Sequence, residues 1–424
     1  MSEVLLGELL NCKGITYGVV KPGDYETNGI PLIKAADVEN GRVNTTPNFR
    51  ISREKHQEHS RTELNGGELL ITLVGTPGQC AIAPPEVKGF NVVRAVGVFS
   101  VNTLADSRFI MYSIQAPESQ AYIRNVCNTT VQATLNLSDF KGLPLSIPEI
   151  NEQKAIAHIL GTLDDKIELN RKTNETLEAM AKALFKSWFV DFDPVRAKVE
   201  GRPTGLPDEI SDLFPDSFED SELGEIPSGW KISSIYEVSS VIYGAPFSSA
   251  LFNSNGEGVP VARIRDLPTE APAIFTTEIH PKGTLIKPGD IIVGMDGEFR
   301  AYLWGGNECW MNQRVCQFVP KASDHSCFVM ESIRKPLMEV EISETATTVI
   351  HLGKGDIDSF KIVIPNQTIL DLFGVRTKPL LDSIVRNKKE NRSLTQLRDA
   401  LLPKLISGEI CIPDAETMLE EAGI

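Results

Sequence analysis

Basic side chains that could bind phosphate groups gather in one polar segment of the sequence and recur further along it. Arginine and lysine hold phosphates as cations, and arginine can also pair with the edge of a guanine base. The first group lies beside His56 and His59 and consists of Arg50, Arg53, Lys55 and Arg61. The candidates further along the sequence are Arg263, Arg265 and Arg300. A basic loop is more often simply solvated, so this alternative stays open for each residue.

A second set of polar side chains follows short apolar runs that we interpret as strands. Asparagine and glutamine can form two hydrogen bonds with adenine, and arginine can do the same with guanine. The candidates are Asn91, Arg94, Asn312, Gln313 and Arg314. Capping of a loop is an equally good interpretation of their polarity.

The sequence lacks the motifs that would let this chain catalyse a reaction by itself. It contains no Asp/Asn-Pro-Pro-aromatic motif of an amino-methyltransferase and no glycine-rich phosphate loop. The spacing of Glu152 and Lys154 resembles that of a nuclease, but no paired acid precedes it and a helix start is the favoured interpretation. We therefore expect no catalytic residues.

Cysteine and histidine spacing predicts neither a disulfide framework nor a metal site. The seven cysteines are scattered without a Cys-x-x-Cys pair. His56 and His59 have a His-x-x-His spacing, but no third ligand is suggested nearby. A solvated loop is the favoured interpretation of the two histidines.

The net charge of -15 argues at first against a polyanionic partner, but the charge is unevenly distributed. Residues 196–225 hold nine acids and three bases together with several Pro and Gly, which predicts an acidic linker. Residues 1–145 are nearly neutral, with 14 acids and 13 bases. No run of about 18 apolar residues and no basic signal start occur, so we expect a cytoplasmic protein without a membrane partner.

The chain is a tandem duplication. The octet at residues 170–177 returns at 387–394, an offset of 217, which also pairs Ile147-Pro148 with Ile364-Pro365. The apolar run at 31–37 resembles that at 260–266, with an offset of 229, and the run at 67–71 resembles that at 289–293, with an offset of 222. One scaffold carrying loops of different length is therefore expected in each half.

Each half ends in a long amphipathic stretch whose 4-3 spacing is typical of a coiled-coil seam. The seam residues are Ile167, Asn170, Asn174, Leu177 and Leu184 in one copy and Ile384, Asn387, Asn391, Leu394 and Leu401 in the other. A duplicated pair of polar seam residues indicates that the two helices pack on each other; solvated surface helices are the alternative.

Local signals place the starts of these helices. A capping box at Thr162 to Asp165 and a proline at 379 predict helices from 163 to about 190 and from 379 to about 406. Near the end of the first, Phe185, Trp188 and Phe189 form an apolar cluster. It fits either packing against the second helix or binding of a partner protein.

Two stretches, LPLSIPEINEQKAIAHIL (143–160) and LFKSWFVDFDPVRAKVEG (184–201), resemble the specificity subunit of type I restriction-modification systems. The resemblance implies two target-recognition domains, each reading one part of a split, asymmetric double-stranded DNA target. It also implies helical regions that bind methyltransferase subunits, two of which are expected, and restriction subunits in the full complex. S-adenosylmethionine, ATP and Mg²⁺ would be bound by those partners and none by this chain. The second copy departs at Ile369-Leu370, which replaces Glu152-Gln153.

The expected fold is α+β, with two recognition domains separated by two long antiparallel coiled-coil helices and related by a pseudo-twofold. The expected boundaries are recognition domain 1 at 1–145, a helical region at 146–195, the linker at 196–225, recognition domain 2 at 226–365, a second helical region at 366–410 and a tail at 411–424. Two other hypotheses remain, a stand-alone nuclease with an unrecognised site and a non-catalytic dimerising scaffold. Metal-dependent cleavage by the purified chain would favour the first, and absence of sequence-specific binding the second.

Overall fold

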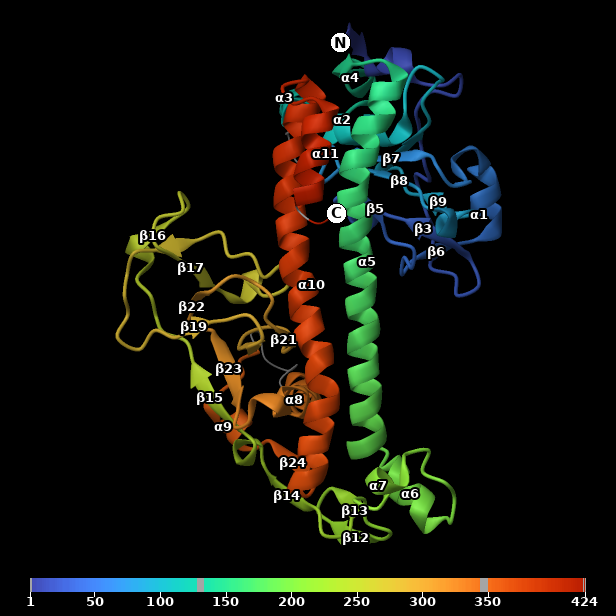
Figure 1. The fold of residues 1–424 in the computed structure, drawn as a ribbon. Helices are drawn as coiled ribbons and strands as arrows, with labels where there is room; N and C mark the ends of the chain where they lie inside the picture. The colour runs from blue at the N-terminus through green and yellow to red at the C-terminus, as the bar shows by residue number, and fades with distance from the viewer. Residues whose placement is uncertain (1, 128–132, 344–349, 422, 424) are drawn as a thin grey trace. The chain divides into compact units, whose positions relative to one another are not determined.

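The computed structural model describes residues 2–127, 133–343, 350–421 and 423, and has a mixed α+β fold (Figure 1). The chain divides into two compact units. Unit 1 comprises residues 1–166 together with 394–424, and unit 2 comprises residues 167–393.

Unit 1 closes on itself because its first strand, β1 (Ser2–Leu5), pairs antiparallel with β11 (Pro144–Ile147), the strand that precedes the long helix. A four-stranded sheet follows the order β2 (Thr16–Tyr17), β10 (Val96–Phe99), β7 (Leu69–Thr72), β8 (Cys80–Ile82). A second sheet has the order β6 (Arg50–Ile51), β3 (Ile30–Ile33), β9 (Asn91–Val92), and β4 (Val38–Glu39) pairs with β5 (Arg42–Val43). The helices are α1 (Arg53–Glu58), α2 (Ser107–Gln115), α3 (Pro117–Val126), α4 (Leu137–Lys141) and α11 (Ile412–Glu421).

Unit 2 repeats this closure through β14 (Lys231–Ser234) and β24 (Lys361–Ile364). Its four-stranded sheet has the order β15 (Ser239–Tyr243), β23 (Val315–Pro320), β20 (Ile291–Gly294), β21 (Ala301–Leu303). Its five-stranded sheet has the order β16 (Phe252–Asn253), β18 (Phe275–Thr276), β17 (Val259–Ala262), β22 (Cys309–Met311), β19 (Leu285–Ile286). The helices α8 (Ser326–Ser343) and α9 (Lys354–Asp358) complete it.

The two units share one topology, which confirms the duplication. The order β2-β10-β7-β8 recurs as β15-β23-β20-β21, and the parallel pair β3·β9 recurs as β17·β22. Gly18 and Gly244 are needed at matching places, because an added Cβ would lie 1.9 Å from the Val92 carbonyl oxygen and 2.0 Å from that of Asn312. Both glycines let two backbones approach closely.

The long helices are α5 (Ile150–Phe189) and α10 (Gln367–Ser407), and both begin earlier than the sequence predicts. The predicted start at Thr162 is wrong, since Thr162 lies inside α5 and its hydroxyl donates to the His158 carbonyl oxygen at 2.9 Å. The predicted start at Pro379 is also wrong. The turns before Pro379 bury Ile369, Leu370 and Phe373, and this burial outweighs the poor helix propensity of proline.

Gly161 has a packing role in unit 1. A Cβ at this position would lie 2.6 Å from the guanidinium carbon of Arg108, whose Nη1 donates to Asp165 at 3.2 Å. One turn along, the Asp164 carboxylate accepts hydrogen bonds from the Tyr112 hydroxyl at 2.6 Å and from Arg398 at 2.7 Å. Burial, followed by the Asp164 carboxylate, raises the pKa of Tyr112. Helix α5 is thus fixed to α2 and α10 by a polar cluster.

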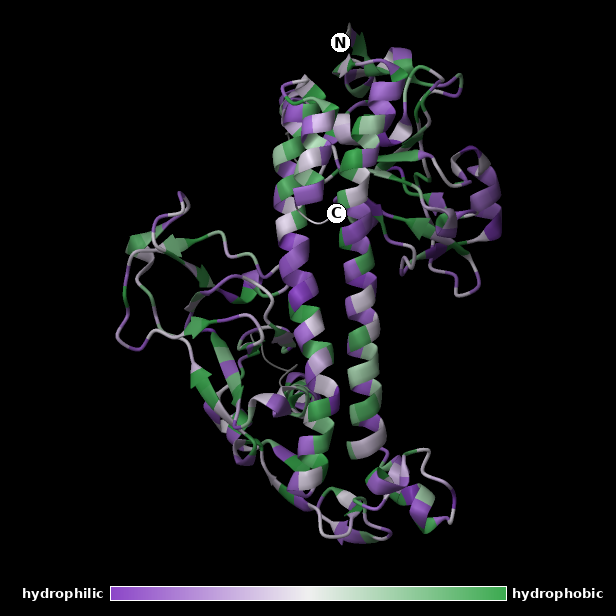
Figure 2. Cartoon of the chain, in the orientation of Figure 1, coloured by the Kyte–Doolittle hydropathy of each residue, from purple (hydrophilic) through white to green (hydrophobic). Residues whose placement is uncertain are grey.

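The duplicated asparagines meet in unit 2, as the sequence predicts. Asn170 donates to Asn391 at 2.9 Å, and Asn387 donates to Asn174 at 2.8 Å, so numbering rises on α5 as it falls on α10 and the helices are antiparallel. Apolar seam residues flank them. Ile167 and Ile384 are buried in unit 2, Leu394 and Leu401 are buried in unit 1, and Leu177 and Leu184 are half-buried. Figure 2 shows polar and apolar residues interleaved along both helices.

Replacing Asn174 with alanine is expected to lower the free energy of unfolding of unit 2 by about 1–3 kcal/mol, because the amide of Asn387 loses its acceptor inside the seam. Urea unfolding of the full chain measures this loss. The exposed neighbour Thr173→Ala should cost less than about 0.5 kcal/mol. Leucine at both 174 and 387 should restore much of the stability, and a double variant no better than the single one would contradict the polar-pair explanation.

The predicted acidic linker is folded against unit 2. It contains most of α6 (Asp193–Val199), all of α7 (Asp208–Ser211), β12 (Phe218–Ser221) and the start of β13 (Gly224–Pro227). Phe214 is 1% exposed, and its ring centroid lies 5.0 Å from that of Trp188. The acids of this segment are therefore carried on a structured surface whose apolar side chains join the core.

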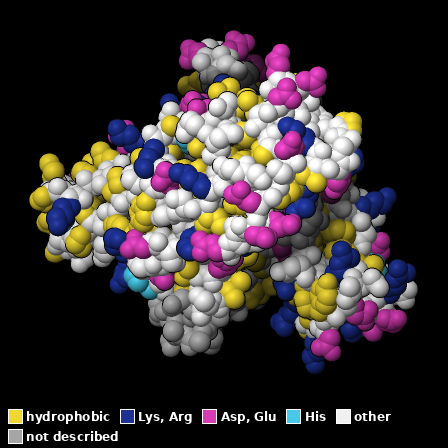
Figure 3. Space-filling model, turned by 90° about the horizontal axis from the view of Figure 1, so that it is seen from below, with side chains coloured by type: hydrophobic (Ala, Val, Ile, Leu, Met, Phe, Trp, Pro, Cys, Tyr) yellow, Lys and Arg dark blue, Asp and Glu magenta, His cyan; other side chains and the backbone are white. Residues whose placement is uncertain are grey.

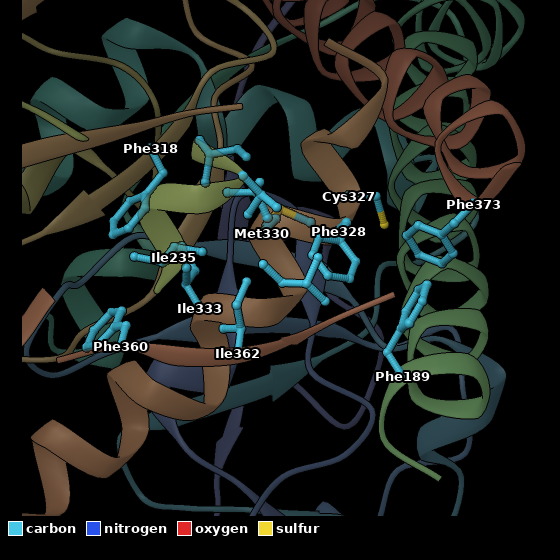
Figure 4. Close-up of a cluster of buried hydrophobic side chains, with 14 of the residues drawn as sticks. Phe189, Ile235, Phe318, Cys327, Phe328, Met330, Ile333, Phe360, Ile362 and Phe373 are labelled. Atoms are coloured by element: carbon cyan, nitrogen blue, oxygen red, sulfur yellow. The ribbon is translucent and has the colours of Figure 1, made fainter. Parts of the chain in front are cut away.

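The aromatic cluster at the end of α5 belongs to the core of unit 2. Phe189 lies 4.9 Å from Phe373 of α10 and 5.1 Å from Phe328 of α8, measured between ring centroids, and these rings converge in Figure 4. Trp188 and Phe189 are buried, and Phe185 is half-buried beside the same two phenylalanines. Trp188 and Phe189 therefore pack in the core, as one of the two interpretations expects, and their burial leaves these two side chains unavailable to a partner.

Candidate nucleic-acid interface

The first basic segment forms the short helix α1 and the turn after it, where a loop was expected. Ser52 caps α1 by accepting a hydrogen bond from the Lys55 amide at 3.1 Å. Two of the candidates are engaged within the protein, because Arg50 donates to the Gly29 carbonyl oxygen at 3.1 Å and Lys55 forms an ion pair with Glu58. Arg53 and Arg61 are exposed and stay candidates for phosphate contact.

Asn91 is a structural residue, and its prediction as a base contact is wrong. Its side chain is buried, and its Oδ1 accepts from the Thr62 hydroxyl at 2.8 Å while its Nδ2 donates to the His59 carbonyl oxygen at 3.1 Å. These bonds tie β9 to the turn after α1. His56, with its Nε2 3.3 Å from Glu63, belongs to the same network.

Arg94 and Gln313 occupy the same turn in the two units. The turn follows β9 in unit 1 and β22 in unit 2, and the next strand begins at Val96 and Val315, an offset of 219. Parallel bridges join Val19 to Val93 and Ala245 to Asn312 at the start of the two turns. The offset aligns Arg94 with Gln313 and Ala95 with Arg314, and the structure exposes the arginines and the glutamine.

Two of the remaining basic candidates are engaged within unit 2. Arg263 pairs with the buried Asp266 through its Nε at 2.9 Å, and its backbone amide donates to the same carboxylate at 3.0 Å. Arg300 donates to Glu341 at 2.7 Å, and this hydrogen bond raises the pKa of the guanidinium. Arg265 is exposed, and no partner for its side chain occurs among the described residues.

Arg314 lies in a polar cluster that the sequence analysis did not identify. Its Nε is 3.4 Å from the Asp296 carboxylate, and the other oxygen of that carboxylate is 2.6 Å from Nδ1 of His351. Asp296 follows β20 and His351 precedes α9, so the three residues are far apart in sequence. No fixed spacing could have indicated them, although the alignment of the two halves points to their positions.

The surface in Figure 3 carries basic and acidic side chains intermingled, so this face is not a continuous cationic surface. Within the described ranges, no group of three or more His, Cys, Asp or Glu side chains is placed to hold a metal ion. No helix of the described residues is both long and apolar enough to cross a bilayer. Glu152 and Lys154 lie in the first turns of α5.

Gln153, between them, is buried and anchors α5 to unit 1. It accepts a hydrogen bond from the Asp106 amide at 2.9 Å and donates to the carbonyl oxygens of Leu104 and Pro148 at 3.1 and 2.9 Å. In the second copy the equivalent residue is Leu370, which is 3% exposed. The first copy thus has a buried, hydrogen-bonded glutamine where the second copy has a buried leucine.

Comparison with known proteins gives consistent results. The sequence model of the family described as "Type I restriction modification DNA specificity domain" matches residues 3–179 and 227–374. The chain is 26% identical over 407 residues to the type I restriction enzyme MjaIX specificity subunit of Methanocaldococcus jannaschii, covering 92% of this chain and 89% of that protein. It is 27% identical over 337 residues to the type I restriction enzyme HindI specificity subunit of Haemophilus influenzae, covering 65% and 71%.

The fold is also found in a solved structure. The crystal structure of the S subunit of a type I restriction-modification system from M. genitalium matches with a TM-score of 0.51 and 17% sequence identity, covering 95% of each chain. This match supports the fold, and the two segments of the family match coincide with the two copies of the sheet topology.

Proposed function

This chain belongs to the type I restriction-modification DNA specificity family, and we propose that it is the subunit that selects the DNA target of such a complex. Each copy of the sheet topology is a recognition domain that reads one half of a bipartite, asymmetric sequence. The observation that carries this proposal is the repetition of one backbone frame with different side chains at the shared turn, Arg94-Ala95 in one copy and Gln313-Arg314 in the other.

The proposal assigns this chain no catalytic step. Methyltransferase subunits, one for each helical region and therefore two, dock on the helices, and restriction subunits join through them in the cytoplasm. S-adenosylmethionine, ATP and Mg²⁺ are bound by those partners. The exposed bases Arg53, Arg61 and Arg265 suit phosphate contacts, which position a protein on DNA without reading its sequence.

The test is the replacement of one recognition domain by the equivalent domain of a family member with a different target. We place the junction after Ile147, where β11 ends, because a cut at 145 would divide the strand that pairs with β1. The hybrid is produced together with methyltransferase subunits, and methylated adenines are mapped by single-molecule sequencing. One half of the methylated motif should change and the other half should stay the same.

The reciprocal replacement of residues 228–364, from the end of β13 to the end of β24, is the matched control, and it should change the other half of the motif. A change of both halves by either hybrid would contradict independent reading. Metal-dependent cleavage of DNA by the purified chain would favour a stand-alone nuclease instead, and methylation without any sequence preference would favour a simple scaffold.

A further inference from the structure

The surroundings of the shared turn correspond between the two units as closely as the turn does. In unit 1 an antiparallel bridge joins Val74, after β7, to Thr134. In unit 2 the matching bridge joins Asp296, after β20, to His351. Each turn is therefore flanked by the end of the same sheet strand and by the same incoming segment.

The chemistry at these matching positions differs completely. Unit 1 has Arg94 and Ala95 in the turn, with Val74 and Thr134 beside it. Unit 2 has Gln313, Arg314, Asp296 and His351 at the corresponding positions. Two domains that recognise different DNA sequences need the same backbone structure with different side chains. The shared backbone sets the position of the side chains, and the side chains select the base.

The side chains at the turn are available for a ligand. Arg94 and Gln313 are exposed, and neither side chain has a hydrogen-bond or ion-pair partner within the part of the chain that the structure describes. Their backbones are held, since the Arg94 amide donates to the Val19 carbonyl oxygen at 2.8 Å and Asn312, next to Gln313, forms a bridge with Ala245. A free side chain on a fixed backbone is suited to direct contact with a base edge.

Arg314 differs from Arg94 because other residues orient it. One Asp296 oxygen is 3.4 Å from its Nε, and the other is 2.6 Å from Nδ1 of His351, so that nitrogen carries a proton and donates. The side chain of Arg314 is still 53% exposed. Nη1 of Arg314 also lies 3.4 Å from Nδ1 of His351. A guanidinium has five N–H donors, so the N–H groups of Nη1 and Nη2 that point away from Asp296 and His351 can still form a two-bond contact with guanine.

We propose that this turn is the base-reading element of each recognition domain. Arg94 reads a guanine in the first half-site, Gln313 reads an adenine and Arg314 a guanine in the second, and Asp296 and His351 are positioning residues for Arg314. The inference rests on the proposed function and names the bases that the same site selects.

Exchange of the matched residues tests the reading roles. Arg94→Gln and Gln313→Arg are produced separately with methyltransferase subunits in cells carrying a plasmid library of randomised targets, and methylated adenines are mapped. Arg94→Gln should lower methylation of the original motif by about 5- to 150-fold and favour adenine in place of guanine at one position of one half-site. Gln313→Arg should make the opposite change in the other half-site only.

A matched variant separates reading from general attraction to DNA. Arg94→Lys keeps the charge but cannot form the planar two-bond contact, so it should relax the preference at the same position. A uniform fall in methylation across all sequences, which is the behaviour of a phosphate contact, would overturn the inference. So would an unchanged motif at an unchanged rate.

The positioning role of Asp296 has its own test. Asp296→Ala should relax the preference at one base of the second half-site and leave the first half-site unchanged, and Asp296→Asn, which keeps an oxygen acceptor, should restore most of it. Glu298→Ala is the control, because that carboxylate is 78% exposed and pairs with Arg300 instead. Loss of methylation without relaxation, or equal effects of both alanine variants, would contradict positioning.

Failure of the proposed function and failure of base reading by this turn give different experimental results. If the unmodified protein directs no methylation of a bipartite motif, the proposed function itself is wrong. If it directs such methylation and the exchanges at 94 and 313 leave the motif unchanged, the function stands and base reading by this turn is wrong.

Discussion

Replacing Trp188 with alanine is expected to lower the free energy of unfolding of unit 2 by about 3–5 kcal/mol. The indole is 1% exposed and lies 5.0 Å from the Phe214 ring and 5.9 Å from the Phe373 ring, so its removal leaves a cavity among aromatic side chains from three segments. Urea unfolding of the full chain, followed by hydrogen exchange of peptides from residues 167–393, measures the loss.

Met180→Ala is the control for this substitution. Met180 lies on the same helix but is 53% exposed, so the change should cost less than about 0.5 kcal/mol. A Trp188 variant that unfolds like the unmodified protein yet no longer recruits methyltransferase subunits would favour partner binding over packing as the role of this side chain.

Replacing Lys388 with alanine is expected to cost about 3 kcal/mol, because it leaves the Glu270 carboxylate poorly compensated inside unit 2. The ammonium group donates to Glu270 at 2.6 Å and to the Leu303 carbonyl oxygen at 2.9 Å, and the Glu270 residue is only 9% exposed. Chemical denaturation measures the cost. Lys389→Ala, at the exposed neighbouring position, should change stability by less than about 0.5 kcal/mol.

A second substitution shows whether the charge pair causes the loss. Lys388→Met combined with Glu270→Gln removes both charges and should recover more than half of the stability, since no unpaired charge stays buried. A double variant as unstable as Lys388→Ala would indicate that the lysine stem, and not the ion pair, stabilises α10 against the sheet.

The duplication made the architecture readable from the sequence. An offset of 217 relates the octets at 170 and 387 and also relates β11 to β24, and the two asparagines of each octet do meet in the seam. Seam residues were predictable because helical periodicity records which face is buried. The same alignment, followed through the strands, would have matched Arg94 with Gln313.

Features that depend on tertiary contacts could not be predicted. Gly161 looks like a helix boundary, but its missing side chain makes room for Arg108, which comes from a distant helix. Asn91 looks like a polar group at a strand end, but Thr62 and His59 bury and satisfy it. In each case the local sequence signal was a reasonable one, but a contact with a residue distant in sequence determined the role of the side chain.

Individual residues of the candidate site could be predicted from the sequence, but which of them lie together in the structure could not. Arg314 was identified as a candidate from its residue type and position, whereas Asp296 and His351 gave no signal because their proximity depends on a bridge between segments 55 residues apart. The prediction for Phe185, Trp188 and Phe189 left two roles open, and sequence alone does not say which surface an aromatic cluster covers.

The composition of the two units has a consequence for synthesis on the ribosome. Unit 2 is one continuous segment, residues 167–393, whereas unit 1 needs residues 394–424 beside its first 166. Leu394, Leu401 and Leu405, which are buried, are translated after all of unit 2. The chain of unit 2 is therefore fully synthesised before that of unit 1, which must wait for its last residues, among them Arg398, the hydrogen-bond donor to Asp164 of α5. We therefore expect unit 1 to close only at the end of synthesis, when the C-terminal part of α10 becomes available.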